Sequence, residues 1–243
     1  MVVHMPAKVI IVMSPKGGVG KTTAAVNLAT AISSLGRKTL LVDANLETPH
    51  VAVYYGFVGF KYSLEDVLNG ATDLKNAIYA GDNPNFNLLP ARVSKKAADR
   101  SSHRLVNINL YLKKIEDLYD FIVIDSKPSY DIDFIKLIKN ANGLIVSNPD
   151  ITSVIEAKKL KEEMADAAIP VMGLIINRIN GRIKEQMDVK EIKELTGIKN
   201  TWKIREDNGV YRALKEGIPI VMSSPKSRAS RDIMDISKEI TRL

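Results

Sequence analysis

A glycine-rich segment between an apolar run and a helical pattern restricts this sequence more than any other feature does. Residues Ser14–Thr23 read SPKGGVGKTT, between the apolar run Lys8–Met13 and a helical pattern over Thr22–Leu35. Closely spaced glycines allow several backbone N–H groups to converge on one anion, and the positive end of the following helix points at the same place. This order of strand, loop and helix predicts a phosphate-binding loop.

Apolar runs and helical patterns alternate along the rest of the chain. Buried parallel strands read as short continuous apolar runs, whereas helices carry apolar residues every three or four positions. Further strands are expected at Lys38–Asp43, Phe86–Leu89, Asp120–Asp125, Gly143–Ser147, Val171–Ile176 and Thr201–Ile204. Further helices are expected at Ser63–Asn69, Asp73–Tyr79, Leu105–Leu118, Ile132–Lys139, Ile151–Ala168, Val189–Leu195, Val210–Lys215 and Asp232–Leu243.

This alternation is typical of the α/β class. We predict one doubly wound, mostly parallel sheet of about seven strands with helices on both faces, the architecture of a P-loop NTPase. No linker or internal repeat interrupts the pattern, so residues 1–243 are expected to form a single domain. Ligands of such sheets bind beyond the carboxyl ends of the strands, which is where functional residues are to be sought.

Composition excludes several classes of protein. The chain has no cysteine, which excludes a disulfide framework, a cysteine-ligated zinc site and an iron–sulfur cluster. No stretch approaches the roughly 18 consecutive apolar residues of a membrane-spanning helix. We expect a cytoplasmic protein that reaches a membrane, if at all, through a partner. The net charge of +7 is expected to be spread over a solvated surface.

The phosphate loop departs from the usual P-loop pattern at one position, because Pro15 stands where that pattern has a glycine. A variant pattern, Lys-Gly-Gly-x-Gly-Lys-Thr-Thr, matches Lys16–Thr23 completely. In this respect the chain resembles the MinD/ParA family of P-loop ATPases with a deviant Walker A motif, and MinD-like proteins most. The resemblance implies that ATP and Mg²⁺ are cofactors and that Lys16 crosses a dimer interface to the partner's nucleotide.

The individual residues of the loop have distinct expected roles. Lys21 is expected to reach the β- and γ-phosphates, and the Thr22 hydroxyl to ligate Mg²⁺. The nucleotide phosphates are expected to lie against Gly17, Gly18, Val19, Gly20, Lys21, Thr22 and Thr23.

Two carboxylates and one asparagine follow strands that should end near this loop. Asp43 and Asp125 each end a strand, and carboxylates at those points can hold Mg²⁺ through its water shell. Many MinD-like proteins have a second aspartate, which helps to position the attacking water, where this chain has Asn45. An amide can accept a hydrogen bond from water but cannot take its proton. The resemblance implies catalytic roles for Lys16, Lys21, Asp43 and Asn45, and the amide at position 45 predicts slow hydrolysis.

A second departure lies after Asp125. Lys127 stands where the family has a proline, and Ser129 where it has the glycine whose N–H senses the γ-phosphate. This departure also predicts slow turnover. An Asn45→Asp substitution is expected to raise the rate.

The nucleobase contacts are expected further along the chain. Asn177 follows the strand in Ile-Ile-Asn-Arg178, and the resemblance implies that this asparagine binds adenine. Taken alone, an asparagine after a strand is more often a turn residue. Asn177, Arg178, Arg205 and Asp207 are the expected base-binding residues, although Arg205 replaces a proline of the family pattern.

Two groups of cations and one apolar stripe bear on possible partners. Asp99 lies among five cations, Arg92, Lys95, Lys96, Arg100 and Arg104, and a smaller group comprises Lys226, Arg228 and Arg231. We expect solvated surfaces there, with at most weak nucleic-acid contact. The stripe Ile233, Ile236, Ile240 and Leu243 is expected to pack in the core. Membrane-binding MinD proteins have a further basic amphipathic helix, and none is expected here because the sequence given stops at Leu243.

The favoured interpretation is a MinD-like switch ATPase that forms a homodimer around two ATP molecules and engages an unidentified partner protein. Two alternatives stay open: a ParA-like DNA-partitioning ATPase that uses the cation groups, and a scaffold that binds ATP without hydrolysing it. A relative of the bacterial tyrosine kinases would lack Lys16 and end in tyrosines, and this chain does neither.

Overall fold

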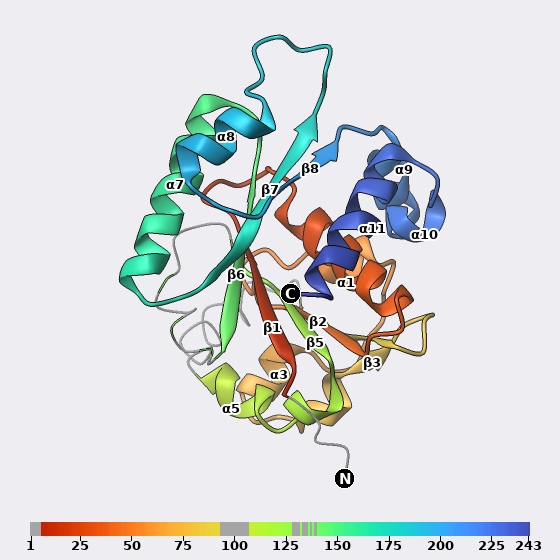
Figure 1. Ribbon diagram of the computed structural model, residues 1–243. Coiled ribbons are helices and arrows are strands. Elements are labelled where there is room, and N and C mark those ends of the chain that lie inside the picture. The colour runs from red at the N-terminus through yellow and green to blue at the C-terminus, as the bar shows by residue number, and fades with distance from the viewer. Residues whose placement is uncertain (1–5, 93–106, 128–131, 133–135, 137, 139) are drawn as a thin grey trace.

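The computed structural model describes residues 6–92, 107–127, 132, 136, 138 and 140–243. Within them, eight strands form one sheet in the order β3-β4-β2-β5-β1-β6-β7-β8 (Figure 1). Neighbouring strands are parallel except for β3 and β4. The strands are β1 (Lys8–Met13), β2 (Thr39–Asp43), β3 (Tyr79–Ala80), β4 (Phe86–Leu89), β5 (Phe121–Asp125), β6 (Ala141–Ser147), β7 (Val171–Ile179) and β8 (Thr201–Arg205).

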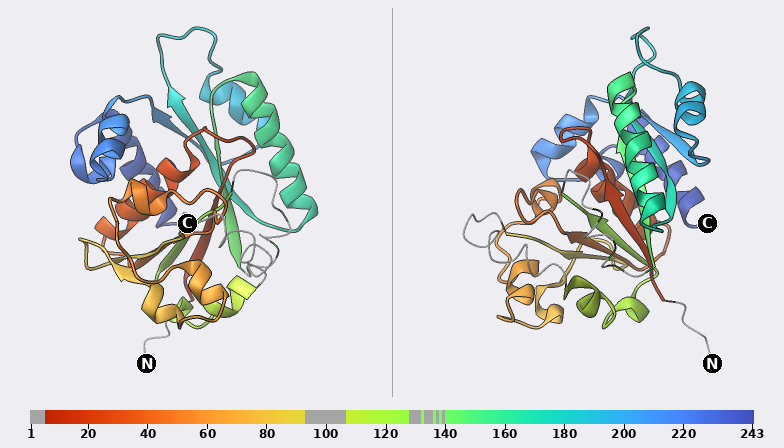
Figure 2. Two further views of the ribbon diagram at one scale, coloured as in Figure 1. Left: turned by 180° about the vertical axis from the view of Figure 1, so that it is seen from behind. Right: turned by 90° about the vertical axis from the view of Figure 1, so that its left-hand side faces the viewer.

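Helices cover both faces of this sheet (Figures 1 and 2). One face carries α1 (Lys21–Ser34), α2 (Val51–Tyr54), α9 (Gly209–Glu216), α10 (Ile220–Ser223) and α11 (Arg228–Ile240). The other carries α3 (Leu64–Leu68), α5 (Ile108–Leu112), α7 (Ile151–Asp166) and α8 (Val189–Thr196). The predicted doubly wound α/β fold is confirmed, with one strand more than expected.

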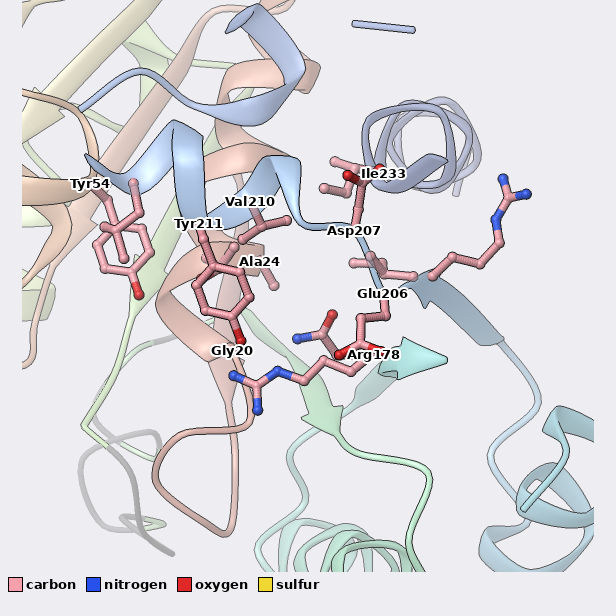
Figure 3. Close-up of a pocket in the computed structure, with 14 residues that line it drawn as sticks. Gly20, Ala24, Tyr54, Arg178, Glu206, Asp207, Val210, Tyr211 and Ile233 are labelled. Carbon is pink, nitrogen blue, oxygen red and sulfur yellow. The ribbon is translucent and has the colours of Figure 1, made fainter. Parts of the chain in front are cut away.

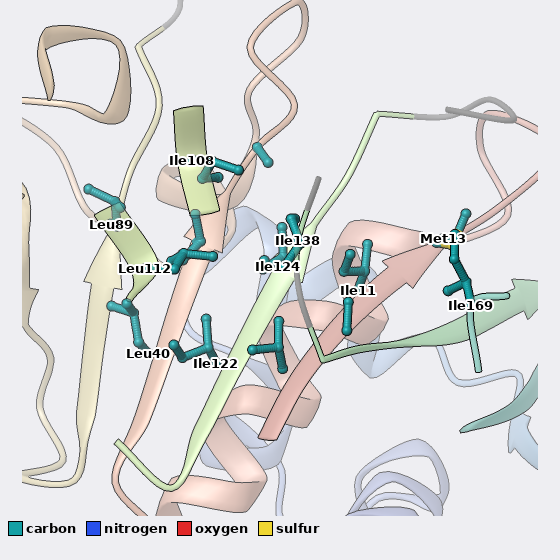
Figure 4. Packing of buried hydrophobic residues seen from close by; sticks show 14 of the residues in the cluster. Ile11, Met13, Leu40, Leu89, Ile108, Leu112, Ile122, Ile124, Ile138 and Ile169 are labelled. Atoms are coloured by element: carbon teal, nitrogen blue, oxygen red, sulfur yellow. The ribbon is translucent and has the colours of Figure 1, made fainter. Parts of the chain in front are cut away.

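Strand β1 shows why the two apolar layers form. Successive side chains of a strand point to opposite faces, so Ile10 and Val12 belong to the apolar layer that includes α1 and α11, whereas Ile11 and Met13 belong to the layer that includes α7. Figure 4 shows Ile11 and Met13 among the isoleucines and leucines of the second layer. Because both faces are covered, every position after Lys8 in this strand is buried, which explains its continuous apolar run.

The register of the sheet places the two carboxylates that were expected to hold Mg²⁺ side by side. Asp43 of β2 pairs with Asp125 of β5, and β1 runs between β5 and β6 into the glycine-rich loop. The carboxyl ends of these strands therefore present the loop and both carboxylates at one edge of the sheet.

Several helix predictions need correction. The helix expected at Asp73–Tyr79 is a shorter 3-10 helix, Leu74–Ala77, and Tyr79 belongs to β3. Of the helix expected at Leu105–Leu118, residues 105 and 106 lie outside the described residues, and the rest contains α5 and a separate 3-10 helix at Glu116–Leu118. Most of Ile132–Lys139 lies outside the described residues. Helix α2 was not predicted.

The C-terminal helix begins four residues before its predicted start, because the Ser227 hydroxyl caps it by accepting from Ser230 N–H at 3.2 Å. Ile233, Ile236 and Ile240 are buried as expected, whereas Leu243 is exposed, because the helix ends before it. In the described part of the chain, no helix combines the length and apolarity needed to cross a membrane.

Candidate functional site

The glycine-rich loop folds into a cradle at the end of β1. Gly18 and Gly20 have φ angles of 78° and 95°, a left-handed region that residues with a side chain rarely adopt. The Ser14 hydroxyl closes the loop by donating to the Lys16 carbonyl at 2.8 Å. Gly20 is the N-cap of α1 and supplies no capping side chain, so the helix N-terminus faces the loop uncapped. Backbone N–H groups arranged in this way fit a phosphate group.

Lys21 and Thr22 both contact Asp125 across the sheet edge. The Lys21 ammonium lies 2.5 Å from Asp125 Oδ1, and the Thr22 hydroxyl donates to Asp125 Oδ2 at 2.7 Å. Lys21 and Asp125 are almost completely buried, so the ion pair is shielded from water. The predicted loop lysine, loop threonine and second acidic residue therefore meet at one point.

Asp43 is buried beside this pair. Its carboxylate accepts hydrogen bonds from Asn45 N–H at 3.1 Å and from Val51 N–H at 3.0 Å. Burial and then repulsion from Asp125 raise the pKa of Asp43 well above its ordinary value, and these two hydrogen bonds oppose the rise only in part. A hydroxyl and two carboxylates are the oxygen donors that Mg²⁺ prefers, so Thr22, Asp43 and Asp125 fit a magnesium ion.

Asn45 makes a compact turn with Thr48. Its amide Nδ2 donates to the Thr48 carbonyl at 2.8 Å, and its Oδ1 accepts from Thr48 N–H at 3.2 Å. In this conformation the side chain serves the turn, so its predicted role toward an attacking water would require the turn to open. Just beyond, the Lys127 ammonium lies 3.7 Å from the Glu47 carboxylate and links the loops that follow β2 and β5. Ser129 lies outside the described residues.

Lys16 is held by the first turn of α7. Its ammonium donates to the Thr152 hydroxyl at 3.0 Å, and that hydroxyl donates to Asp150 Oδ1 at 2.6 Å. Asp150 also caps α7 by accepting from Ser153 N–H. Burial opposes the charged form of Asp150, but the hydrogen bonds from Thr152 and Ser153 lower its pKa to about 2, with the positive charge of Lys16 contributing.

A pocket between the glycine-rich loop, β7, β8 and α9 suits a nucleobase (Figure 3). The Asn177 amide Nδ2 donates to the Val19 carbonyl at 2.8 Å, which fixes the side chain against the loop. A Cβ on Gly20 would displace that amide, and the positive φ of Gly20 already favours glycine there. The pocket is lined by Gly20, Thr23, Ala24, Tyr54, Asn177, Arg178, Ile204, Arg205, Glu206, Asp207, Val210, Tyr211, Leu214 and Ile233.

The other predicted base-binding residues also line the pocket but have structural partners. Arg205 forms a two-pronged ion pair with Asp232 of α11, with contacts of 2.7 and 2.9 Å. Asp207 accepts from Gly209 N–H at 2.8 Å and from Arg228 N–H at 3.0 Å, so it caps both α9 and α11. These contacts tie β8, α9 and α11 together around the pocket.

Sequence reasoning missed Tyr54 and Tyr211 as pocket residues. Tyr54 belongs to α2, which was not predicted, and nothing in the sequence of α9 marks Tyr211 before the topology is known. Arg92 was assigned to a cation group, but its guanidinium pairs with Asp66 at 3.1 Å and donates to the Lys61 carbonyl at 2.9 Å. Lys95, Lys96, Arg100 and Arg104 lie outside the described residues, whereas Lys226, Arg228 and Arg231 are exposed.

Known proteins that are similar to this chain include ATP-binding proteins. A family model described as an AAA domain matches residues 7–185. An uncharacterised ATP-binding protein of Methanocaldococcus jannaschii is 32% identical over 239 residues, which are 98% of this chain and 89% of the relative.

Two solved structures are similar along almost the whole chain. The cell division ATPase MinD of Pyrococcus furiosus superposes with a TM-score of 0.90 at 27% identity, covering 98% of this chain and 100% of that one. The septum site-determining protein MinD of Pyrococcus horikoshii, solved with Mg-ADP, gives 0.89 at 27% identity and covers 96% of each chain. The chain is therefore a MinD/ParA-type ATPase, a member of the P-loop family with the deviant Walker A motif, and it is similar to MinD-like proteins over nearly its full length.

Proposed function

We propose that this protein is a nucleotide switch that binds ATP with Mg²⁺, hydrolyses it slowly, and as an ATP-bound homodimer engages a partner protein. The observation that carries the proposal is the meeting of Lys21, Thr22 and Asp125 beside Asp43 at the end of the glycine cradle. Lys21 and the loop N–H groups neutralise the phosphates, and Mg²⁺ held near Thr22, Asp43 and Asp125 supplies charge stabilisation during hydrolysis.

The pocket favours adenine over guanine. Because Asn177 Nδ2 is used by the Val19 carbonyl, Oδ1 is the part of the amide available as an acceptor. The exocyclic amine of adenine donates a hydrogen bond, whereas guanine presents a carbonyl oxygen at the equivalent position. Arg178 lies beside Asn177 on the same pocket wall.

Dimerisation is proposed to need both ATP and Lys16. Lys21 already serves the phosphates within one chain, so a second loop lysine on the surface suits a phosphate bound by another chain. The hydrogen bond to Thr152 holds Lys16 at the N-terminus of α7, and Lys16 must leave this partner to cross an interface. One exchanged hydrogen bond is a small barrier, on the order of 1 kcal/mol.

Calorimetry with ATP and Mg²⁺ tests nucleotide binding. Lys21→Ala removes a charge-assisted contact and is expected to weaken binding by about 1.5–3 kcal/mol. Lys16→Ala is the matched control, because it removes the neighbouring lysine but should keep ATP binding within one chain. Equal affinities for the wild type and Lys21→Ala would reject the site.

Light scattering with a slowly hydrolysed ATP analogue tests the switch. The wild type should form a dimer with the analogue and stay a monomer with ADP, and Lys16→Ala should stay a monomer with both. A wild-type dimer that ignores the nucleotide would contradict the proposal. A pull-down with ATP-bound and ADP-bound protein then addresses the partner.

A further inference from the structure

Strand β7 contains an irregularity at its predicted base-binding residues. Ile176 pairs with Lys203 and Ile179 pairs with Arg205, so three steps along β7 match two steps along β8. The extra residue lies at Asn177–Arg178, and Arg178 has a φ angle of 57°. This left-handed conformation is uncommon for a residue with a long side chain, so the surrounding structure must hold it.

The irregularity brings two neighbouring side chains to one place. In a regular strand, Asn177 and Arg178 would point to opposite faces of the sheet. Here both line the nucleobase pocket, and Figure 3 shows the Arg178 side chain reaching across it toward Tyr211. Extra residues in strands re-aim side chains in this way beside functional sites.

The segment that follows β7 holds this conformation through Gln186. Its amide Nε2 donates to the Arg178 carbonyl at 3.2 Å, and its Oε1 accepts from Asn180 N–H at 2.8 Å. One half-buried side chain therefore bridges the backbone on both sides of Ile179. In Figure 1 this segment, residues 180–188, extends beyond the tip of β7, so the bridge crosses the base of a projecting loop.

A second tie comes from β8. Glu206 N–H donates to the Ile179 carbonyl at 2.9 Å, and the Glu206 carboxylate accepts from Asn180 Nδ2 at 2.7 Å. These contacts fix Ile179 and Asn180 but do not reach the Arg178 carbonyl. That carbonyl accepts from the Gln186 amide.

We propose that Gln186 is a positioning residue for the nucleobase: its amide bridge holds Arg178 in the left-handed conformation that turns Asn177 and Arg178 into the same pocket. The inference rests on the proposed function, because it assigns a role in ATP binding to a residue that does not itself line the pocket. Without the bridge, the backbone at Arg178 relaxes toward an ordinary strand conformation, and one of the two side chains leaves the pocket.

Gln186→Ala is the test variant, and the probes are ATP and inorganic tripolyphosphate, each with Mg²⁺. Loss of two hydrogen bonds to backbone groups should weaken ATP binding by about five- to tenfold. Tripolyphosphate has no base, so its affinity should stay within twofold of the wild-type value. Glu185→Ala, the exposed neighbour in the same loop, is the matched control and should bind both probes as the wild type does.

Glycine at position 178 gives a second readout that a general structural role would not produce. Glycine adopts a positive φ readily, so in an Arg178→Gly background the bridge has little left to hold. Adding Gln186→Ala to Arg178→Gly should then change ATP affinity less than twofold, although the same change weakens the wild type several-fold.

The outcomes separate this inference from the proposed function. If Gln186→Ala weakened the binding of ATP and of tripolyphosphate equally, or weakened neither, the role of Gln186 would be overturned. The proposed nucleobase pocket would still stand in that case, provided that Asn177→Ala weakens ATP binding. Full additivity with Arg178→Gly would overturn the role of Gln186 as well. Wild-type protein that binds tripolyphosphate as tightly as ATP, with Asn177→Ala inert, would overturn the nucleobase pocket and this inference together.

Discussion

Asp43 is a buried carboxylate whose position is unfavourable for stability but suits the proposed Mg²⁺ site. A fully buried carboxylate beside a second one is unfavourable unless cations or hydrogen bonds compensate it, and Lys21 is bound to Asp125 rather than to Asp43. Asp43 is compensated by two backbone N–H groups and, more weakly, by the positive charge of the nearby Lys21. Such a residue lowers the stability of the nucleotide-free protein, and a divalent cation would relieve the repulsion.

We therefore predict that Asp43→Asn stabilises the nucleotide-free protein and weakens Mg²⁺-dependent ATP binding. A raised folded-state pKa means that the folded protein binds more protons than the unfolded chain above about pH 4. Wild-type stability should thus fall relative to Asp43→Asn as pH rises from about 4 through the raised pKa. Below pH 4 the two should converge.

Thermal melts from pH 3.5 to 8 measure this difference. A gain of 1 kcal/mol corresponds to a melting temperature about 2–4 °C higher for a chain of this size. Asp117→Asn, which removes an exposed carboxyl group, is the control and should leave the curve unchanged. If Asp43→Asn melted below the wild type at pH 8, the carboxylate would be a structural necessity.

Asn45 gives the second prediction at this scale. Asn45→Asp adds a carboxylate near the proposed γ-phosphate site and loses the donor to the Thr48 carbonyl, which loosens the turn. We expect single-turnover hydrolysis of bound ATP to accelerate several-fold, on the order of 1–2 kcal/mol in barrier.

Thr48→Ala is the matched control, because it loosens the same turn without adding a carboxylate. It should leave the rate unchanged. Equal acceleration in both variants would mean that loop opening, rather than the carboxylate, sets the rate. A slower Asn45→Asp variant with ATP still bound would make Asn45 a structural residue.

Among the secondary-structure elements, α9 and α11 are joined through one carboxylate. Asp207 accepts N–H groups from the first turns of both helices. Partial burial alone would raise its pKa, but these hydrogen bonds outweigh burial and lower it. Because α9 lines the pocket and α11 packs on α1, this residue links the pocket to the core.

Asp207→Asn should destabilise the protein by about 1–2 kcal/mol at pH 7, since a neutral amide accepts these bonds less well. A lowered folded-state pKa contributes stability above about pH 4, which is lost as pH falls through the folded value. The difference from the wild type should therefore shrink in melts below pH 4. Asp235→Asn, on the exposed side of α11, should melt within about 1 °C of the wild type. Equal losses in both variants would argue against the double cap.

Some helices and strands of this fold could be predicted from the sequence, and others could not. Buried parallel strands were found because burial on both faces requires apolar residues at every position, as in β1 and β5. Helix α2 was missed because it has four residues, too few for a helical period, and its first N–H is fixed by Asp43 rather than by a local cap. Strand β3 has two residues and forms only by pairing with β4.

For the whole molecule, the sheet explains why several residues proposed for the candidate site lie together. Asp43, Asp125 and Asn177 were selected from the sequence because parallel strands bring their carboxyl ends to one edge, and the structure places them at that edge. The roles of Gln186 and Tyr211 depend on how separate loops and helices pack around that edge, and no local pattern records this. Asp207 was found by resemblance, but its double cap became visible only when α9 and α11 were placed.

The net charge of +7 bears on the alternative that this protein is a ParA-like ATPase that binds DNA. Nonspecific DNA affinity depends on how many cations can neutralise phosphates. Arg92 is already paired with Asp66, which leaves Lys95, Lys96, Arg100 and Arg104 in its group. Four phosphate contacts would give a slope of about −3.6 for log affinity against log salt, and such binding is largely lost at physiological salt.

We therefore predict no DNA mobility shift at physiological salt, with or without ATP, and a weak shift at low salt. Lys95→Glu with Lys96→Glu should abolish the weak shift, and Lys226→Glu with Arg231→Glu tests the second cation group. An ATP-dependent shift that persists at physiological salt would favour the ParA-like alternative. Lys16→Ala would then decide how DNA is bound: if the shift disappears, pairing of two chains is needed to gather enough cations, because each chain alone offers too few.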